Sequence, residues 1–154
     1  MLGPSGVGKS SLLSCLCGSE KPTEGTVNFK IDNEEERDPE SISPHLGVIF
    51  QNLRLTAHAT VLDNVLYGRL GKYKLKETLW GFSQKSRQEA YTILEDLGIP
   101  HLAYKWMTQT SGGEQQRTAI ARTLFHDPKI ILADEPASNL DTYYAGRILG
   151  LLRN

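Results

Sequence analysis

The residues best suited to chemistry form a glycine-rich stretch near the start of the chain, GPSGVGKS at positions 3–10. This spacing matches the phosphate-loop pattern GxxxxGK[ST], in which glycines let successive backbone N–H groups converge on phosphate oxygens. In such a loop Lys9 would reach the β and γ phosphates, and the Ser10 hydroxyl would bind Mg²⁺. The sequence therefore predicts a nucleotide site built from Gly3, Pro4, Ser5, Gly6, Val7, Gly8, Lys9 and Ser10.

Two adjacent carboxylates follow the apolar stretch KIILA at positions 129–133. Asp134 stands where a phosphate-loop enzyme places its Mg²⁺-holding carboxylate, at the end of a buried strand. Glu135 beside it could orient or polarise an attacking water. Acidic pairs are also common at strand ends without any chemical role, so the glycine-rich loop is what favours the catalytic interpretation.

A third pattern, TSGGEQQR at positions 110–117, allows two interpretations. Ser111 and Glu114 have the spacing of a capping box, which predicts a well-capped helix. Two consecutive glycines, however, weaken a helix start by about 1 kcal/mol each relative to alanine, and they let backbone N–H groups approach an anion closely. The functional interpretation is a second anion site that acts on a nucleotide held by a partner.

The elements that must position these residues follow from hydrophobic periodicity and turn signals. A helix over 10–17 follows the glycine-rich loop, TVNFKI (26–31) reads as an edge strand, 32–41 as an acidic loop and 46–51 as a buried strand. A helix is predicted behind Thr60, and a capping box of Ser86 and Glu89 predicts the next, closed by Gly98 and Pro100. A helix over 111–125, a fully buried strand over 129–136 and a helix from position 142 complete the pattern.

Composition excludes several classes of protein. The net charge of −1 gives no basic field for nucleic acid, and no apolar run approaches the roughly 20 residues that span a bilayer. Cys15 and Cys17 are two apart on a predicted helix and point to different sides, so we interpret them as packing thiols. The stretch 72–82, rich in Lys and aromatic residues, is either a variable surface segment or a docking surface.

The ordered set GPSGVGKSS, VIFQ, TSGGEQQRTAIAR, IILADEP and SNLD resembles the nucleotide-binding domain of an ABC transporter over nearly the whole chain. The resemblance implies an α/β fold: a three-layer P-loop NTPase core with a mainly parallel sheet (1–59 and 111–154) and an inserted helical subdomain (60–110). It also implies ATP hydrolysis with Mg²⁺, in which Glu135, Gln51 and Lys9 are catalytic and Ser10, Gln51 and Asp134 hold the metal. The further nucleotide contacts that it implies are Ser11, Asp141 and, toward the opposite subunit's ATP, Ser111, Gly112, Gly113 and Glu114.

Partners follow from the same resemblance. They are a second nucleotide-binding subunit in a homodimer, transmembrane permease subunits at the cytoplasmic face of the membrane and, indirectly, a solute-binding protein, with no nucleic acid. VLDNVLYGRLG, ETLWGF and KIILADEPASNLD look most like the ATPase subunit of phosphonate importers. The alternatives are the ATPase of another importer, a soluble ABC protein acting on DNA or ribosomes, and a nucleotide-binding fragment with little activity.

The chain departs from the family pattern in several places. Thr110 stands where the signature usually has Leu, and Glu114 where it usually has Gln, which adds negative charge near a γ-phosphate. The adenine-stacking aromatic, expected before the glycine-rich loop, and the switch His, expected beyond Asp141, have no counterpart. We therefore expect a chain that is cut at both ends and, by itself, catalytically poor.

Overall fold

The computed structural model describes residues 8–30, 38–72 and 81–133. Its regular elements, in chain order, are α1 (Lys9–Leu16), α2 (Pro39–Ile42), β1 (Leu46–Ile49), α3 (Val61–Leu66), α5 (Gln84–Asp96), α6 (Gly112–His126) and β2 (Ile130–Ala133). Short 3₁₀ turns occupy Ser43–His45, Tyr67–Lys72, Pro100–Leu102 and Met107–Gln109. The predicted site residues Gly3 to Val7, Asp134, Glu135 and Asp141 lie outside the described residues.

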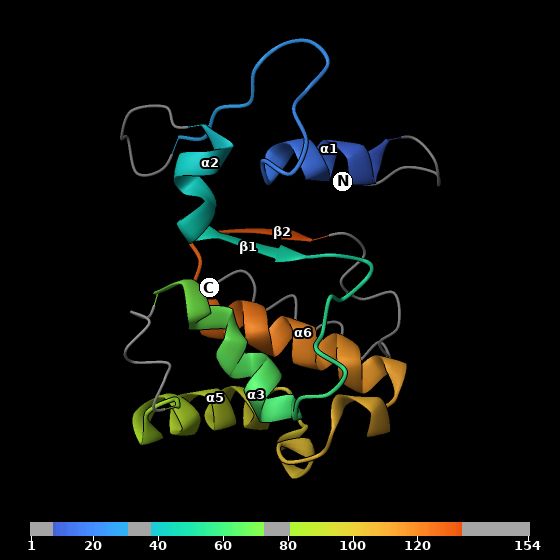
Figure 1. Ribbon diagram of the computed structural model, residues 1–154, viewed down its shortest axis with the longest axis vertical. Helices are drawn as coiled ribbons and strands as arrows, with labels where there is room; N and C mark the ends of the chain where they lie inside the picture. The colour runs from blue at the N-terminus through green and yellow to red at the C-terminus, as the bar shows by residue number, and fades with distance from the viewer. Residues whose placement is uncertain (1–7, 31–37, 73–80, 134–154) are drawn as a thin grey trace.

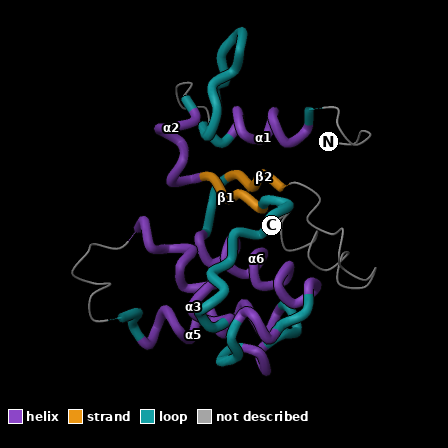
Figure 2. The backbone as a smooth tube through the Cα atoms, turned by 45° about the vertical axis from the view of Figure 1, so that its right-hand side comes forward, coloured by secondary structure: helices purple, strands orange, loops and turns teal. Residues whose placement is uncertain are grey.

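The two strands form a parallel pair, with Leu46 opposite Ile130 and Ile49 opposite Ala133. Helix α1 lies over one face of this pair, and α6 with α3 and α5 lies over the other (Figures 1 and 2). Parallel strands need helical crossovers, which cover both faces of such a sheet. The predicted layered α/β fold with a parallel sheet is confirmed.

The hydrophobic core lies between the sheet and the helices α3, α5 and α6. Short apolar stretches at helical spacing supply it, because each helix turns one stripe of side chains toward the other two. Its fully buried large side chains include Ile49, Val61, Val65, Leu66, Leu94, Leu97, Ile99, Ile120 and Phe125. The core therefore fixes α6 against the sheet and against α3 and α5. The predicted domain boundaries themselves stay a prediction.

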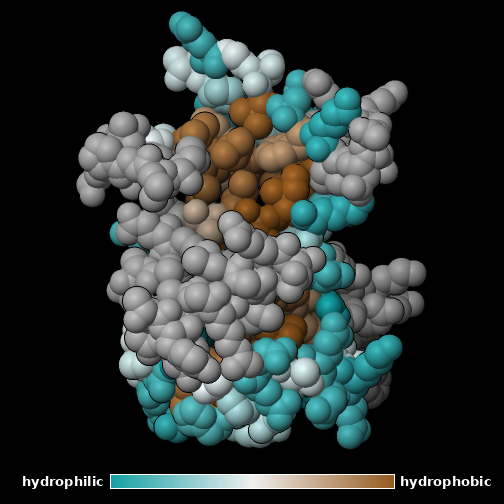
Figure 3. Space-filling model, turned by 180° about the vertical axis from the view of Figure 1, so that it is seen from behind, coloured by the Kyte–Doolittle hydropathy of each residue, from teal (hydrophilic) through white to brown (hydrophobic). Residues whose placement is uncertain are grey.

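The side of the molecule that contains β2 and α1 is more exposed to solvent than the core between the sheet and α3, α5 and α6. All four residues of β2 are partly exposed, and Leu12 of α1 is 45% exposed. Figure 3 shows apolar side chains gathered on the upper half of the back face. The prediction of a fully buried strand over 129–136 is thus wrong for its described residues, because β2 pairs with β1 along one edge only within the described part of the chain.

Two other local predictions are corrected. Among residues 26–30 only Phe29 is in a β-bridge, and none forms a ladder with a described strand, so the predicted strand over 26–31 does not extend over its described part. Helix α5 begins at Gln84, because the Ser83 hydroxyl accepts a hydrogen bond from the Ser86 N–H at 3.1 Å. The predicted cap at Ser86 is therefore one turn too late, and Glu89 pairs with Arg69 instead of closing a capping box.

Candidate functional site

The start of α1 has the geometry that an anion site requires. Gly8 precedes the helix with φ of 89°, a left-handed conformation that favours glycine, and no side chain caps this end. A Cβ at Gly8 would have no described heavy atom within 4 Å, so packing against the described residues does not require glycine there. The first backbone N–H groups of a helix have no partner inside it. These groups fit a phosphate, and the first of them belong to the last residues of the predicted loop.

The start of α6 is capped as the sequence predicts. The Ser111 N–H and hydroxyl donate to a Glu114 carboxylate oxygen at 2.7 and 2.9 Å, and the Glu114 N–H donates to the Ser111 hydroxyl at 3.4 Å. The bond from the Ser111 N–H is the main reason that the pKa of Glu114 lies below its usual value. The Glu114 carboxylate therefore accepts hydrogen bonds from the N–H and the hydroxyl of Ser111 at the start of α6. This helix end is the one predicted to face a γ-phosphate.

Packing does not require glycine at position 112. Gly112 is exposed, and a Cβ built on it meets no described atom within 4 Å. Its backbone does not need a positive φ either. Since glycine weakens a helix start, this position favours the interpretation that another molecule approaches the backbone closely.

The chain after β1 brings Gln51 to the start of α6. Gln51 is exposed and forms no hydrogen bond with another described residue. It lines a hollow of about 370 Å³ together with Gly112 and Gln115. Two site residues predicted from separate motifs thus lie at one hollow, while the side chains of Lys9 and Ser10 are not described.

Two residues that the motifs did not single out hold the chain beside this hollow. The Arg122 guanidinium donates to the carbonyls of Leu53 and Arg54 at 2.7 and 2.8 Å. The fully buried Asn64 amide accepts from the Thr56 N–H at 2.8 Å and donates to the Thr56 carbonyl at 3.1 Å. An asparagine inside the apolar stretch VLDNVL was the available sequence signal; Arg122 gave none beyond its place on the helix.

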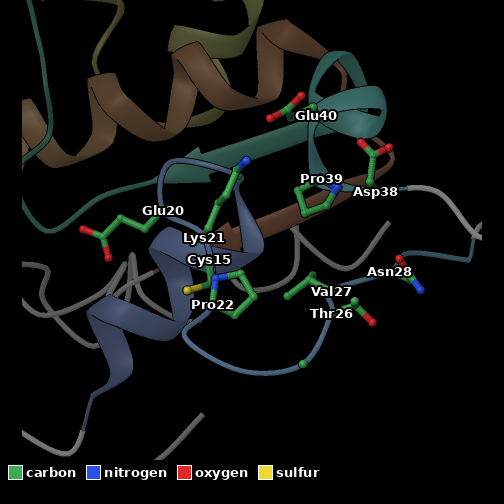
Figure 4. A pocket seen from close by; sticks show the side chains of 12 residues that line it. Cys15, Glu20, Lys21, Pro22, Thr26, Val27, Asn28, Asp38, Pro39 and Glu40 are labelled. Carbon is green, nitrogen blue, oxygen red and sulfur yellow. The ribbon is translucent and has the colours of Figure 1, made fainter.

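A second hollow, of about 440 Å³, has no predicted site residue among the described residues that line it. The end of α1, the chain over 20–28 and the start of α2 line it (Figure 4). Cys15 contributes to its wall, and both cysteines are partly exposed. The Cys17 thiol lies 3.5 Å from the Ser14 carbonyl.

Within residues 8–30, 38–72 and 81–133 no helix is long and apolar enough to cross a membrane.

The parallel strands with helices on both faces are the fold of an ATP-binding cassette, and comparison with known proteins agrees. The sequence profile of the ABC transporter family matches residues 1–138. The chain belongs to the ABC transporter family.

Among its relatives is the phosphonates import ATP-binding protein PhnC 2 of Oceanobacillus iheyensis, 39% identical over 157 residues that cover 99% of this chain and 62% of that protein. The glutamate transport ATP-binding protein GluA of Corynebacterium efficiens is also 39% identical, over 99% of this chain and 61% of its own length. The dimeric bacterial ABC transporter cassette MJ0796 superposes with a TM-score of 0.80 and 36% identity, over 98% of this chain and 66% of that one. The chain thus spans less than two thirds of the length of these relatives.

Proposed function

We propose that this chain is part of the ATP-hydrolysing subunit of an ABC importer. The observation that carries the proposal is the start of α1, which no side chain caps and which follows a left-handed Gly8 within the phosphate-loop sequence. The N–H groups and the dipole of that helix end stabilise a phosphate. Positions 3–11 would hold the triphosphate, with Lys9 neutralising the β and γ phosphates.

Mg²⁺ supplies positive charge to the β and γ phosphate oxygens when it is bound. Ser10, Gln51 and Asp134 would hold it, and a hydroxyl, an amide oxygen and a carboxylate are the oxygen ligands that Mg²⁺ prefers. The Gln51 side chain is exposed and forms no hydrogen bond with another described residue, which fits this role.

Hydrolysis would depend on Glu135. Its carboxylate would orient a water and accept a proton as the water oxygen bonds to the γ-phosphorus and the bond to the β-phosphate oxygen breaks, which yields ADP and inorganic phosphate. Ser111, Gly112 and Gly113 would contact the γ-phosphate of ATP held by a second copy, and Asp141 would lie at that dimer interface. Dimer closure would then drive permease subunits at the cytoplasmic face of the membrane, where the exposed chain after Gln51 would meet them.

The test is ATP turnover by the complete subunit with its permease. Glu135→Gln is expected to lower turnover by roughly a thousandfold or more and to retain MgATP binding, because it removes the proton acceptor but not the phosphate site. Lys9→Ala is expected to weaken ATP binding itself. Glu24→Gln, in an exposed loop, is the matched control and keeps wild-type turnover. Turnover of Glu135→Gln at the wild-type rate would refute the proposal.

We further propose a phosphonate as the solute, delivered by a separate solute-binding protein. Its support is the similarity to phosphonate import ATP-binding proteins, and the equal identity to a glutamate transport protein makes glutamate the competing candidate. Deletion of the gene should abolish growth on a phosphonate as sole phosphorus source and leave glutamate uptake intact. The reverse result would assign the subunit to glutamate import.

A further inference from the structure

Arg122 joins the C-terminal half of α6 to a distant part of the chain. Its guanidinium donates from both terminal nitrogens to backbone carbonyls 69 and 68 positions earlier, those of Leu53 and Arg54. Burial lowers the pKa of Arg122, so its charge is costly to keep in place and the two carbonyl dipoles compensate for it. Moving the Arg122 guanidinium away from these two carbonyls would therefore leave a partly buried charge without compensation.

The segment that Arg122 holds has little regular structure of its own. Arg54 has φ of 48°, a left-handed conformation that is uncommon for residues other than glycine. Its guanidinium lies 3.9 Å from the centre of the Phe50 ring, which closes the bend on itself. No strand ladder or helix supports the chain from Gln51 to Arg54, so bonds from other elements set its position.

Those bonds come from two helices. Arg122 of α6 holds the bend at Leu53 and Arg54, and Asn64 of α3 holds Thr56 immediately after it. Figures 1 and 2 show this part of the chain leaving β1 and running past α6 toward α3. Gln51 is two residues before the Arg122 contact, and the same α6 begins at Gly112, which lines the hollow that Gln51 lines.

We propose that Arg122 is a positioning residue that makes Gln51 move as one body with α6. This inference rests on the proposed function, in which Gln51 binds Mg²⁺ in one subunit and Gly112 meets the γ-phosphate held by the other. Arg122 then fixes the spacing between these two contacts when the subunits close on ATP. Without Arg122, α6 can contact the partner's nucleotide while Gln51 does not move with it.

The test combines hydrogen exchange with steady-state ATP hydrolysis in the complete subunit with its permease. Arg122→Ala is expected to speed exchange of the amides over 52–56 roughly tenfold, because it removes both bonds that fasten the bend, and to leave α5 amides unchanged. It should also lower kcat roughly tenfold with KM for ATP within about twofold, since the phosphate loop is intact. Arg122→Lys can bond one carbonyl and should fall between Arg122→Ala and wild type in both measurements.

Arg69→Ala is the matched control, because the Arg69 guanidinium packs 4.1 Å from the Phe125 ring of the same helix and pairs with Glu89. It should leave exchange over 52–56 and kcat at wild-type values. Unchanged exchange in Arg122→Ala, faster exchange with unchanged kcat, or equal effects of Arg69→Ala would each overturn the proposal. If Arg122→Ala does not fold, wild-type exchange in Arg122→Lys overturns it. A wild-type protein that hydrolyses no ATP refutes the proposed function instead, and the exchange result still decides whether Arg122 positions the segment.

Discussion

Replacing Glu114 by glutamine isolates the effect of one negative charge at the start of α6. Glutamine has nearly the same size and also suits the last position of a capping box, so the geometry of the helix end is retained. What is lost is the carboxylate that accepts from the Ser111 N–H and hydroxyl at 2.7 and 2.9 Å. The experiment therefore measures what that charge does for the fold.

The expected destabilisation is modest. A carboxylate in the first turn of a helix contributes about 0.3–1 kcal/mol through the helix dipole, and solvent screens a partly exposed charge. Its hydrogen bonds weaken when the acceptor becomes neutral, by about 0.5–1 kcal/mol. Because these two effects overlap, we expect the free energy of unfolding to fall by about 1 kcal/mol at pH 7.

The pH dependence gives the sign. The pKa of Glu114 is lower in the folded protein than in the unfolded chain, so its contribution is complete above the unfolded pKa, about 4.3, and disappears as the pH falls through the lower folded pKa. The difference between wild type and Glu114→Gln should therefore vanish at acid pH. Urea unfolding across this pH range measures it.

Glu95→Gln is the matched control. Glu95 is exposed and lies in the last turn of α5, where a negative charge is unfavourable. Its replacement should leave the free energy of unfolding unchanged or raise it slightly at pH 7. The reasoning fails if Glu114→Gln is as stable as wild type at pH 7, or if its deficit persists below the folded pKa.

Three other changes test the packing. Asn64→Asp should lower the free energy of unfolding, measured by urea titration, by about 3 kcal/mol. The reason is that a buried carboxylate carries a charge and cannot donate to the Thr56 carbonyl. An equal effect of Asn52→Asp, at an exposed position, would contradict this. Gly68→Ala should lower the thermal midpoint by several degrees, because its Cβ would overlap the Arg122 carbonyl oxygen; an unchanged midpoint refutes that overlap. Ser83→Ala should cost about 1 kcal/mol in urea titration as the loss of the α5 cap, and no loss would return the cap to a later residue.

Local signals in the sequence predicted the helix starts that depend on local partners. Ser111 and Glu114 are three residues apart, and all the atoms of their capping box belong to one turn, so the sequence spacing contains the geometry. The same spacing misled at Ser86 and Glu89, because the Glu89 carboxylate bonds to Arg69, 20 positions away, and Ser83 takes the cap. The same spacing thus has two outcomes, because at Ser86 a second serine three residues earlier and a long-range contact of Glu89 compete with the box.

The position of Gln51 depends on such contacts even more strongly. The motif VIFQ identifies the residue and the end of its strand, but the chain beyond Ile49 leaves the sheet and takes its shape from Arg122 and Asn64. A bend with Arg54 at positive φ is not what that residue prefers by itself, so the tertiary bonds must outweigh the local preference. The motif therefore names Gln51 as a candidate side chain, which stays a prediction. Its place beside Gly112 depends on the Arg122 guanidinium of α6, which reaches the bend from 68 residues further along the chain.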